Sequence, residues 1–576
     1  MKISNIDVEH FRSIKKCHVR LNEITTIIGE NNAGKTALLR ALNSVFNWEE
    51  EKRYFEDNTH QYVIRTVSKI LLTFEDVPNK PIYADKLYNN KLVLGLSYSY
   101  STSRRGRTLF CVTNVGNKSL EDNFIEQLKQ DIDYIYIPAQ RGNDDLIWKE
   151  ESIFQKVLTA YSQYYTQFRD TASAQIGRVG KSLKKTIFSK IEREFESMSM
   201  LDSDEHYVFD YIENLDYSIF LSKMGIQIRD SRKSYPVTEY GSGIKSLSVI
   251  ALYRALAKNK NVNVILGLEE PEINLHPHAQ KKLIASIKNK RQQMVVQAIM
   301  ATHSTVIVDE LEHEDVILAR RIPDSNRGFH TEFSQIEDDF WNKYNLSEFK
   351  HNKFFKYKNS DFFFAKYIII VESSTDAEVI YKLINELLGD KAYYVSFLNL
   401  DGIKNLKYPY FLLKSLGFDF SMVVDMDFLT QYKNDSLDAS RNPVNHLPEY
   451  KNIVNSRNSV INDIWPKDTD KQQVTNALKQ SYTKAFDICK SKKIFPMQYC
   501  LEMDLVAKNE SRAKYCDVMG IPDDTDANRK LLIEKKDAIK DPEKILAVVS
   551  ALQPVNYPYS YKRIRKAICD DINLSF

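Results

Sequence analysis

Paired cysteines, long apolar runs and an excess of charge of one sign are all missing from this sequence of 576 residues. The six cysteines occur without a CxxC pair, which argues against a disulfide framework or a structural zinc site and predicts reduced thiols. The most apolar window, FFFAKYIIIV, is short and contains Lys366, and no signal peptide opens the chain. These absences predict a cytoplasmic protein without a membrane partner.

The overall charge neither supports nor excludes a nucleic-acid partner. The formal net charge is +3, so any site for nucleic acid must be local. An apolar fraction of 43% with 27% charged residues is typical of a folded protein. The chain is too long for one core, and we expect two or more domains.

A phosphate-binding loop is the most specific motif of the sequence. Residues 29–36 fit G-x-x-x-x-G-K-[ST], between the apolar run 24–28 and the helix-like segment ALLRALNSVF. Glycines in such a loop let backbone N–H groups face phosphate oxygens, the lysine reaches the β and γ phosphates, and the threonine hydroxyl suits Mg²⁺. The residues predicted to bind the nucleotide here are Gly29, Asn32, Gly34, Lys35 and Thr36.

Strand-like patterns surround this loop. Residues 1–21 alternate as two antiparallel strands, and residues 60–115 predict an antiparallel sheet attached to the core. Residues 145–215 contain a helical pattern that is too short for a long coiled coil, and an inserted hairpin that pairs two subunits is the more economical interpretation. Its basic stretch could contact nucleic-acid phosphates, but a solvated helix face is the favoured interpretation.

A second acidic motif completes the predicted ATPase. The apolar run 262–268 ends in Glu269 and Glu270. Two carboxylates at a strand end suit Mg²⁺ chemistry, with Glu269 as a ligand and Glu270 placed to orient or deprotonate the attacking water. His303 follows another apolar run, in MATHS.

The second half of the chain carries a different set of acids. The strand-like YIIIV ends in Glu372, Asp376 follows at a helix start, and SMVVDMDFL presents Asp425 and Asp427. On a regular strand Asp425 and Asp427 would face the same side and could converge with Glu372 on one cation. Mg²⁺ prefers oxygen ligands and keeps waters, one of which can attack a phosphodiester.

Several of these motifs resemble known ATPases and nucleases. Phe11-Arg12-Ser13 resembles the start of ATPases of the RecF, SMC and OLD group, and residues 240–246 resemble a degenerate ABC signature loop. The order E…DxD resembles a Toprim domain. The chain as a whole resembles the OLD (overcoming lysogenization defect) family: an α/β protein with an ABC-type P-loop ATPase at 1–345, including the insertion 145–215, and a Toprim domain at 366–576.

The resemblance implies further roles. Arg12 would lie near the nucleotide, Gln140 would help to coordinate Mg²⁺ and sense the γ-phosphate, and His303 would contact that phosphate. Ser242 and Gly243 would bind the γ-phosphate held by another subunit. In the Toprim half, Asp376 and Glu502 would add to the metal ligands, and Lys544 would neutralise charge at the scissile phosphate. Family members commonly have glycine where this chain has Ser373.

The function implied is that of a DNA endonuclease that uses ATP and Mg²⁺, with Mn²⁺ as the alternative ion. The family also implies a homo-oligomer, dimer or tetramer, formed through the ATPase half, and a role as effector of a bacterial anti-phage system with a partner protein or a reverse-transcribed RNA–DNA element. Two alternatives stay open. One is a RecF- or SMC-like DNA-binding ATPase whose Toprim half docks a partner without cutting, and the other is a nuclease that cuts RNA.

Overall fold

Buried and exposed side chains alternate along the first strands of the chain. β1 (Lys2–Phe11) and β2 (Ile14–Arg20) pair antiparallel, as the sequence predicts. Ile3, Ile6 and Val8 of β1 are fully buried. Ile6 and Val8 follow the two-residue period of a strand, whereas Ile3 is one residue out of that period, where the pairing with β4 shifts its register between Ile3 and Asn5.

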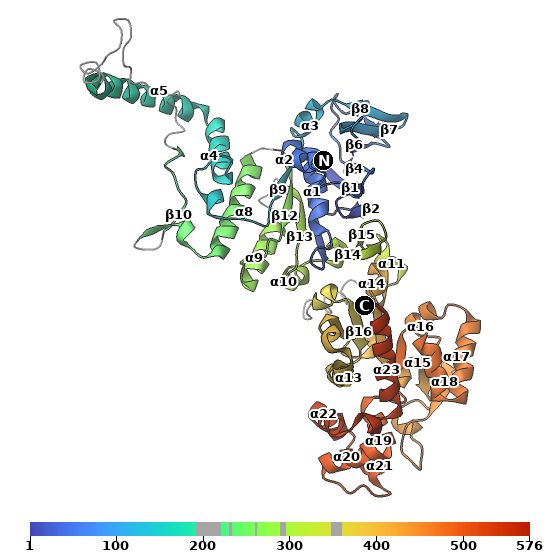
Figure 1. Ribbon diagram of the computed structural model, residues 1–576. Helices are drawn as coiled ribbons and strands as arrows, with labels where there is room; N and C mark the ends of the chain where they lie inside the picture. Colours follow the sequence, from blue (N-terminus) through green and yellow to red (C-terminus); the bar gives the residue numbers. More distant parts are fainter. Residues whose placement is uncertain (192–220, 230–232, 260–261, 289–294, 347–359, 576) are drawn as a thin grey trace. The chain divides into compact units, whose positions relative to one another are not determined.

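The computed structural model describes residues 1–576 except 192–220, 230–232, 260–261, 289–294, 347–359 and 576 (Figure 1). The chain folds into two compact units, Met1–Phe333 and Ser334–Phe576. Over the described ranges, no helix combines the length and the apolar character needed to cross a bilayer.

A mixed sheet organises unit 1. Among the described residues it has 13 strands, in the order β8-β7-β6-β4-β1-β2-β15-β14-β3-β13-β12-β9, with β5 beside β6. Strands β14, β3, β13, β12 and β9 run parallel to one another, and the first five strands of the order pair antiparallel, which confirms the predicted sheet at 60–115. The remaining strands are β3 (Ile24–Gly29), β4 (Val67–Glu75), β5 (Leu87–Tyr88), β6 (Lys91–Ser99), β7 (Gly106–Thr113), β8 (Gly116–Leu120), β9 (Ile132–Ile137), β12 (Asn263–Glu269), β13 (Val295–Ala301), β14 (Val316–Asp324) and β15 (Gly328–Ser334), with a separate hairpin β10 (Gln227–Arg229) and β11 (Ser234–Pro236).

The helices of unit 1 include α1, which follows the phosphate-binding loop. They are α1 (Lys35–Phe46), α2 (Trp48–Glu56), α3 (Asn123–Leu128), α4 (Ile153–Tyr164), α5 (Thr166–Leu183), α8 (Ser242–Asn259), α9 (Pro277–Lys288) and α10 (Thr305–Asp309). The Tyr161 hydroxyl of α4 donates to the carbonyl of Ala255 on α8, at 3.2 Å. The predicted helical insertion contains α4 and α5, whereas its residues 192–215 lie outside the described part of the chain.

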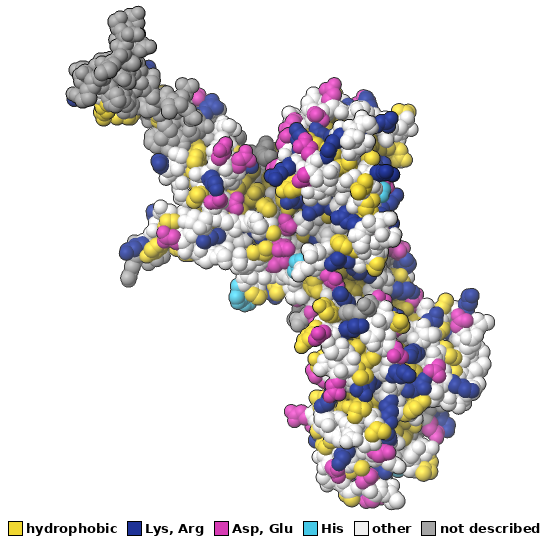
Figure 2. Space-filling view, viewed as in Figure 1, with side chains coloured by type: hydrophobic (Ala, Val, Ile, Leu, Met, Phe, Trp, Pro, Cys, Tyr) yellow, Lys and Arg dark blue, Asp and Glu magenta, His cyan; other side chains and the backbone are white. Residues whose placement is uncertain are grey.

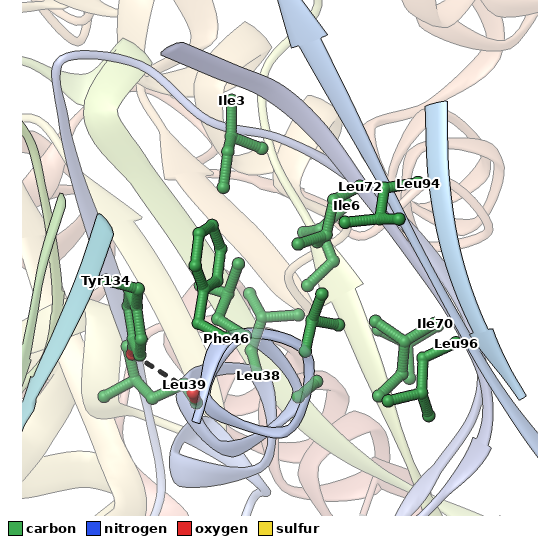
Figure 3. Close-up of a cluster of buried hydrophobic side chains, with 14 of the residues drawn as sticks. Ile3, Ile6, Leu38, Leu39, Phe46, Ile70, Leu72, Leu94, Leu96 and Tyr134 are labelled. Carbon is green, nitrogen blue, oxygen red and sulfur yellow. Dashed lines mark hydrogen bonds between the residues drawn. The ribbon is translucent and has the colours of Figure 1, made fainter. Parts of the chain in front are cut away.

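The core of unit 1 forms around α1 (Figure 3). Leu38, Leu39 and Phe46 are buried among strand residues such as Ile70. The Tyr134 hydroxyl donates to the carbonyl of Leu39 at 3.1 Å. Each large side chain buried in this way contributes about 1.5–3 kcal/mol, so the packing fixes the helix that carries the loop.

Asp315, beside the start of β14, gives unit 1 a pH-dependent stability. Burial raises its pKa from 3.8 to about 6, while the amide of Asn22 donates to it at 3.1 Å. The folded state therefore binds a proton more tightly than the unfolded state, and stability falls as the pH rises from about 4 to about 6.

We expect Asp315→Asn to raise the stability of unit 1 at pH 7 by about 1–2 kcal/mol, allowing for solvent screening, and to leave it unchanged at pH 3.5. Chemical denaturation at the two pH values measures this. Glu121→Gln removes a negative charge from an exposed position of unit 1 and is the control, and an equal gain in the control would contradict the explanation.

Unit 2 is built on a smaller parallel sheet. Its order is β17-β16-β18-β21. These strands are β16 (Tyr367–Val371), β17 (Val395–Asn399), β18 (Phe420–Val424) and β21 (Ile494–Pro496), and β19 (Thr430–Tyr432) pairs with β20 (Tyr450–Val454). The helices are α11 (Phe340–Lys343), α13 (Ser374–Leu388), α14 (Lys407–Leu416), α15 (Met426–Leu429), α16 (Ser459–Ile464), α17 (Asp468–Gln480), α18 (Tyr482–Lys490), α19 (Leu501–Ala507), α20 (Asn509–Met519), α21 (Ala527–Arg529), α22 (Pro542–Ala551) and α23 (Tyr559–Ser575).

The parallel direction of these four strands decides where the acids lie. The carboxyl ends of parallel strands meet at one edge of a sheet. Glu372 directly follows β16 and Asp425 directly follows β18, while β21 leads into α19, which carries Glu502. Acids that are distant in the sequence are therefore brought to the same edge.

Candidate functional site

A cavity of about 440 Å³ lies over the phosphate-binding loop in unit 1. Its lining contains three cations, Arg12, Lys35 and Arg327, and one carboxylate, Glu270. The other residues that line it are Ser13, Asn31, Asn32, Gly34, Thr36, Ala37, Thr59, His303 and Phe329. A cavity with this excess of positive charge fits a polyphosphate.

The loop presents backbone donors to this cavity. Gly34 is the N-cap of α1, with a φ of 95° and no side-chain cap bond, so the first N–H groups of the helix stay available. Asn32 also has a positive φ, 60°. A helix N-terminus with free N–H groups binds anions through these donors and through the helix dipole.

Lys35 is buried and turned back onto its own loop. Its Nζ donates to the carbonyls of Gly29, at 3.1 Å, and Glu30, at 2.9 Å. Burial lowers its pKa to about 8, against the opposing effect of Glu270. A phosphate group would supply the negative charge that this lysine lacks.

Glu269 is held by two hydroxyl groups at the end of β12. Thr36 donates to its Oε1 at 2.6 Å, and Tyr136 of β9 donates to its Oε2. Thr36 and Glu269 are thus in direct contact, which is the pairing expected of two Mg²⁺ ligands. Tyr136 is a residue that the motifs did not indicate. It lies on the strand next to β12, and the pairing of these two strands is not encoded in either motif.

Glu270 and His303 also line this cavity, and Glu272 contacts His303 from outside its lining. The Nε2 of His303 lies 3.9 Å from Glu270 Oε1, and the backbone N–H of His303 donates to Glu272 Oε1 at 2.7 Å. Burial, with the nearby Lys35, lowers the pKa of His303 to about 4, so this imidazole is neutral at pH 7. Burial and the neighbouring Glu272 raise the pKa of Glu270, which suits a group that accepts a proton from water.

The backbone of Glu270 is strained. Its φ is 43°, a conformation that costs a residue with a side chain about 1–3 kcal/mol. Its N–H donates to the carbonyl of Ala301 at 2.8 Å, and its carbonyl accepts from Arg141 Nη2 at 2.6 Å.

The other residues predicted to contact the nucleotide do not all line the 440 Å³ cavity. Arg12 lines the 440 Å³ cavity, whereas Gln140 lines a second cavity of about 770 Å³, together with Glu270 and Asn274. Ser242 begins α8, and Gly243 packs so closely on Asn274 that a Cβ would lie 2.5 Å from its carbonyl oxygen. Neither Ser242 nor Gly243 lines the 440 Å³ cavity.

Three carboxylates of unit 2 converge at the edge of the parallel sheet. Glu372, Asp425 and Asp427 each offer an oxygen, and these oxygens lie within 4.8 Å of one another. Burial, then Asp427 and Asp376, raises the pKa of Glu372 to about 7, and burial followed by Glu372 raises that of Asp425 well above its ordinary value. Clustered carboxylates with raised pKa values, all partly exposed, fit a divalent cation.

The expected geometry of the DxD pair was wrong. β18 ends at Val424, Asp425 is the N-cap of α15, and Asp427 lies in the first turn of that helix. The two side chains therefore meet through a strand-to-helix turn rather than on one face of a strand. The backbone N–H of Asp425 donates to Glu372 Oε1 at 3.0 Å, which ties the two strand ends together.

Asp376 is both near the cluster and part of a helix cap. Its Oδ2 accepts from the N–H of Ser373 at 2.9 Å and from the Ser373 hydroxyl at 2.7 Å, and its own N–H donates back at 3.2 Å. Such a capping box starts α13. Ser373 has a φ of −138°, so this position needs no glycine, and the serine supplies a cap that glycine could not.

Glu502 and Asp504 come from α19. Glu502 is buried and is among the charges that raise the pKa of Asp376 and Asp425. Asp504, which the motifs did not single out as a ligand, accepts backbone N–H groups of Gln498, at 2.9 Å, and Tyr499, at 2.8 Å. It anchors the loop before Glu502. Lys544 lies on α22 and pairs with Asp541 at 3.7 Å.

A nucleotide-binding loop with its acidic strand in one unit, and converging carboxylates at the edge of a parallel sheet in the other, define a P-loop ATPase joined to a TOPRIM domain. Residues 1–91 and 79–308, more than half of the chain, match the family described as AAA ATPase domain, and residues 363–427 match the family described as overcoming lysogenization defect protein-like, TOPRIM domain. The chain therefore belongs to the AAA ATPase domain family and carries an overcoming lysogenization defect protein-like TOPRIM domain, the combination that the sequence motifs predicted.

Several known proteins are similar to this chain. The Old nuclease of Escherichia phage P2 is 22% identical over 469 residues, which cover 75% of this chain and 78% of that protein. The endonuclease GajA of Bacillus cereus (strain HuB5-5) is 21% identical over 517 residues, 74% of each chain. Among solved structures, the SMC head domain from Thermotoga maritima matches 58% of this chain and all of its own, with a TM-score of 0.31 and 13% identity.

Proposed function

We propose that this protein is a metal-dependent endonuclease whose activity is controlled by an ATPase unit. The observation that carries the proposal is the convergence of Glu372, Asp425 and Asp427 within 4.8 Å. Its relatives named Old nuclease and endonuclease GajA support the same reaction class. DNA is the proposed substrate.

In the nuclease site, Glu372, Asp425 and Asp427 would hold Mg²⁺, or Mn²⁺ in its place, with Asp376 and Glu502 as further acids beside them. A bound divalent ion supplies a nucleophilic water at neutral pH and neutralises charge on the phosphate. The chain itself orients the carboxylates: the N–H of Asp425 fixes Glu372, and the capping box of α13 fixes Asp376. Lys544 is proposed to offset charge on the leaving group.

In the ATPase site, Arg12 and Lys35 would bind the phosphates, with Gly29, Asn32 and Gly34 shaping the loop. Thr36 and Glu269 would hold Mg²⁺, and Tyr136 keeps Glu269 oriented. Glu270 would accept the proton of the attacking water, and neutral His303 would contact the γ-phosphate. Gln140 is proposed to sense that phosphate from the neighbouring cavity.

A homo-oligomer, dimer or tetramer, is part of the proposal. Ser242 and Gly243 do not line the nucleotide cavity of their own unit, so they are free to meet a nucleotide held by another copy. The segment 145–215, with α4 and α5, is proposed to pair the subunits. The likeness to GajA supports a defence role, with a partner protein or an RNA–DNA element as the signal.

Charge at the surface is mixed on the face shown in Figure 2, where Lys and Arg alternate with Asp and Glu over both units. On this face the described residues form no broad basic track. With a net charge of +3, contacts to nucleic acid would depend on local groups of positive charge rather than on the charge of the whole protein.

Removal of divalent metal is expected to stop cleavage completely. Purified full-length protein is incubated with supercoiled plasmid, single-stranded DNA or tRNA, with Mg²⁺ or Mn²⁺, with and without ATP. Nicking of plasmid that EDTA abolishes and excess Mg²⁺ restores would support the proposal. ATP hydrolysis without cleavage of any substrate would favour the docking alternative, and cleavage of tRNA alone would favour an RNase.

A further inference from the structure

Arg141 lies directly after the predicted phosphate sensor Gln140 and belongs to none of the motifs. It follows β9, the strand beside β12, and it reaches the turn that begins at Glu270. Its Nη2 donates to the carbonyl oxygen of Glu270 at 2.6 Å, a short bond for a charged donor. The same carbonyl accepts the N–H of Ile273 at 3.1 Å.

The hydrogen bond from Arg141 stabilises the strained backbone of Glu270. Glu270 has a φ of 43°, and residues with side chains adopt such angles only when their surroundings enforce them. On one side the N–H of Glu270 is fixed by Ala301, and on the other its carbonyl is fixed by Arg141. Together these bonds set the direction in which the Glu270 side chain leaves the backbone.

Arg141 approaches Glu270 from outside the nucleotide cavity. Glu270 lines both the 440 Å³ cavity and the 770 Å³ cavity, whereas Arg141 lines only the second. The buried Nε and Nη1 of Arg141 have no hydrogen-bond partner. Burial of the Arg141 guanidinium removes it from water, and only one hydrogen bond, to the Glu270 carbonyl, compensates for that loss. Buried polar groups without partners are uncommon and call for a functional explanation.

We infer that Arg141 is a positioning residue for ATP hydrolysis, which holds the peptide of Glu270 so that its carboxylate meets the attacking water. The inference rests on the proposed ATPase activity. It assigns Arg141 no contact with the nucleotide, and it predicts an effect on the chemical step and not on binding.

The test compares three variants of the full-length protein. Arg141→Gln removes the charged donor, and Arg141→Lys keeps a cation that can donate one bond. Arg254→Gln is the matched control, because Arg254 is also partly buried and donates to Ser286, at 3.0 Å to its hydroxyl, away from the cavity lining. Each variant is measured for steady-state ATP hydrolysis, for binding of a fluorescent ATP analogue and for its melting temperature.

A drop of roughly 10- to 100-fold in kcat is expected for Arg141→Gln, since small misplacement of a reacting group has costs of this size. Affinity for the analogue should stay within about threefold, because a positioning group acts on the transition state alone. Arg141→Lys should recover part of kcat, and Arg254→Gln should keep the wild-type value. Rates are divided by the fraction of protein that binds the analogue, so partial unfolding cannot imitate the effect.

An unchanged kcat in Arg141→Gln would overturn the inference. So would weakened binding with an unchanged kcat, since that pattern indicates direct contact with the nucleotide. A wild-type protein that binds the analogue but hydrolyses no ATP would instead count against the proposed ATPase activity itself.

Discussion

Asp425→Asn is expected to abolish metal-dependent cleavage while leaving the protein at least as stable as the wild type. Asparagine keeps the shape of the side chain and removes one negative charge. Burial raises the pKa of Asp425, and Glu372, Asp376, Glu502 and Asp427 raise it further, so the ionised carboxylates are desolvated and repel one another when no cation is bound. Loss of one charge relieves that repulsion.

The expected size follows from the position of Asp425 in the cluster. Mutation of a residue that only orients a metal ligand lowers metal affinity or activity about 10- to 100-fold. Mutation of a proposed ligand should therefore lower the cleavage rate at least about 100-fold. Relief of about 1 kcal/mol would raise the melting temperature of a unit of this size by about 2–4 °C without metal. Groups with a raised pKa destabilise the fold above that pKa, so the gain should be largest at pH 8 and absent at pH 3.5.

Plasmid nicking, the melting temperature in EDTA and Mn²⁺ binding by electron paramagnetic resonance are measured together. Asp435→Asn removes the same charge from an exposed position of the same unit and serves as the control. Wild-type nicking by Asp425→Asn would refute the nuclease site. A melting temperature below that of the control would refute the repulsion argument. The Mn²⁺ measurement would still show whether Asp425 is a metal ligand.

Gly29→Ala is the second change with a large expected effect. Gly29 ends β3, has a φ of 141°, and pairs with Ala319 of β14. A Cβ at Gly29 would lie 2.1 Å from the carbonyl oxygen of Ala319, so the two central strands would have to separate. Strain in φ and overpacking together should destabilise unit 1 by about 3–5 kcal/mol. The phosphate-binding loop begins at this residue, and affinity for ATP should fall with it.

Gly116→Ala separates the strain in φ from the overpacking against Ala319. Gly116 also has a positive φ, 120°, but no atom lies within 4 Å of the Cβ position. It should therefore lower stability by only about 1 kcal/mol and leave nucleotide binding intact. Differential scanning fluorimetry and titration with a fluorescent ATP analogue measure both effects. Equal losses in the two variants would show that the approach of Ala319 does not matter.

The fold could be predicted from the sequence where motif and periodicity agree. The hairpin of β1 and β2, the strand before the phosphate-binding loop and the parallel strands that lead to Glu372 and Asp425 all have local patterns strong enough to define them. Convergence of the acids could also be predicted, because parallel strands deliver their carboxyl ends to one edge.

The remaining features depend on contacts between distant segments. Asp427 lies on a helix because β18 stops at Val424, and a continuous apolar pattern does not encode that stop. Arg327 reaches the nucleotide cavity from the turn between β14 and β15, which no motif marks. Tyr136 and Arg141 act through β9, and only the pairing of β9 with β12 places them at the acids.

The strand order of unit 1 has a practical consequence for work with fragments. β14 and β15, the last strands of unit 1 along the chain, do not form its border: they fill the middle of the sheet between β3 and β2. A gene fragment cut at residue 308, where the ATPase family match ends, would lack both strands and leave β2 and β3 facing a gap, with unpaired backbone open to aggregation. During translation, likewise, the ribosome must release residues up to about 334 before the sheet can close. An expressed ATPase fragment should therefore extend at least through β15.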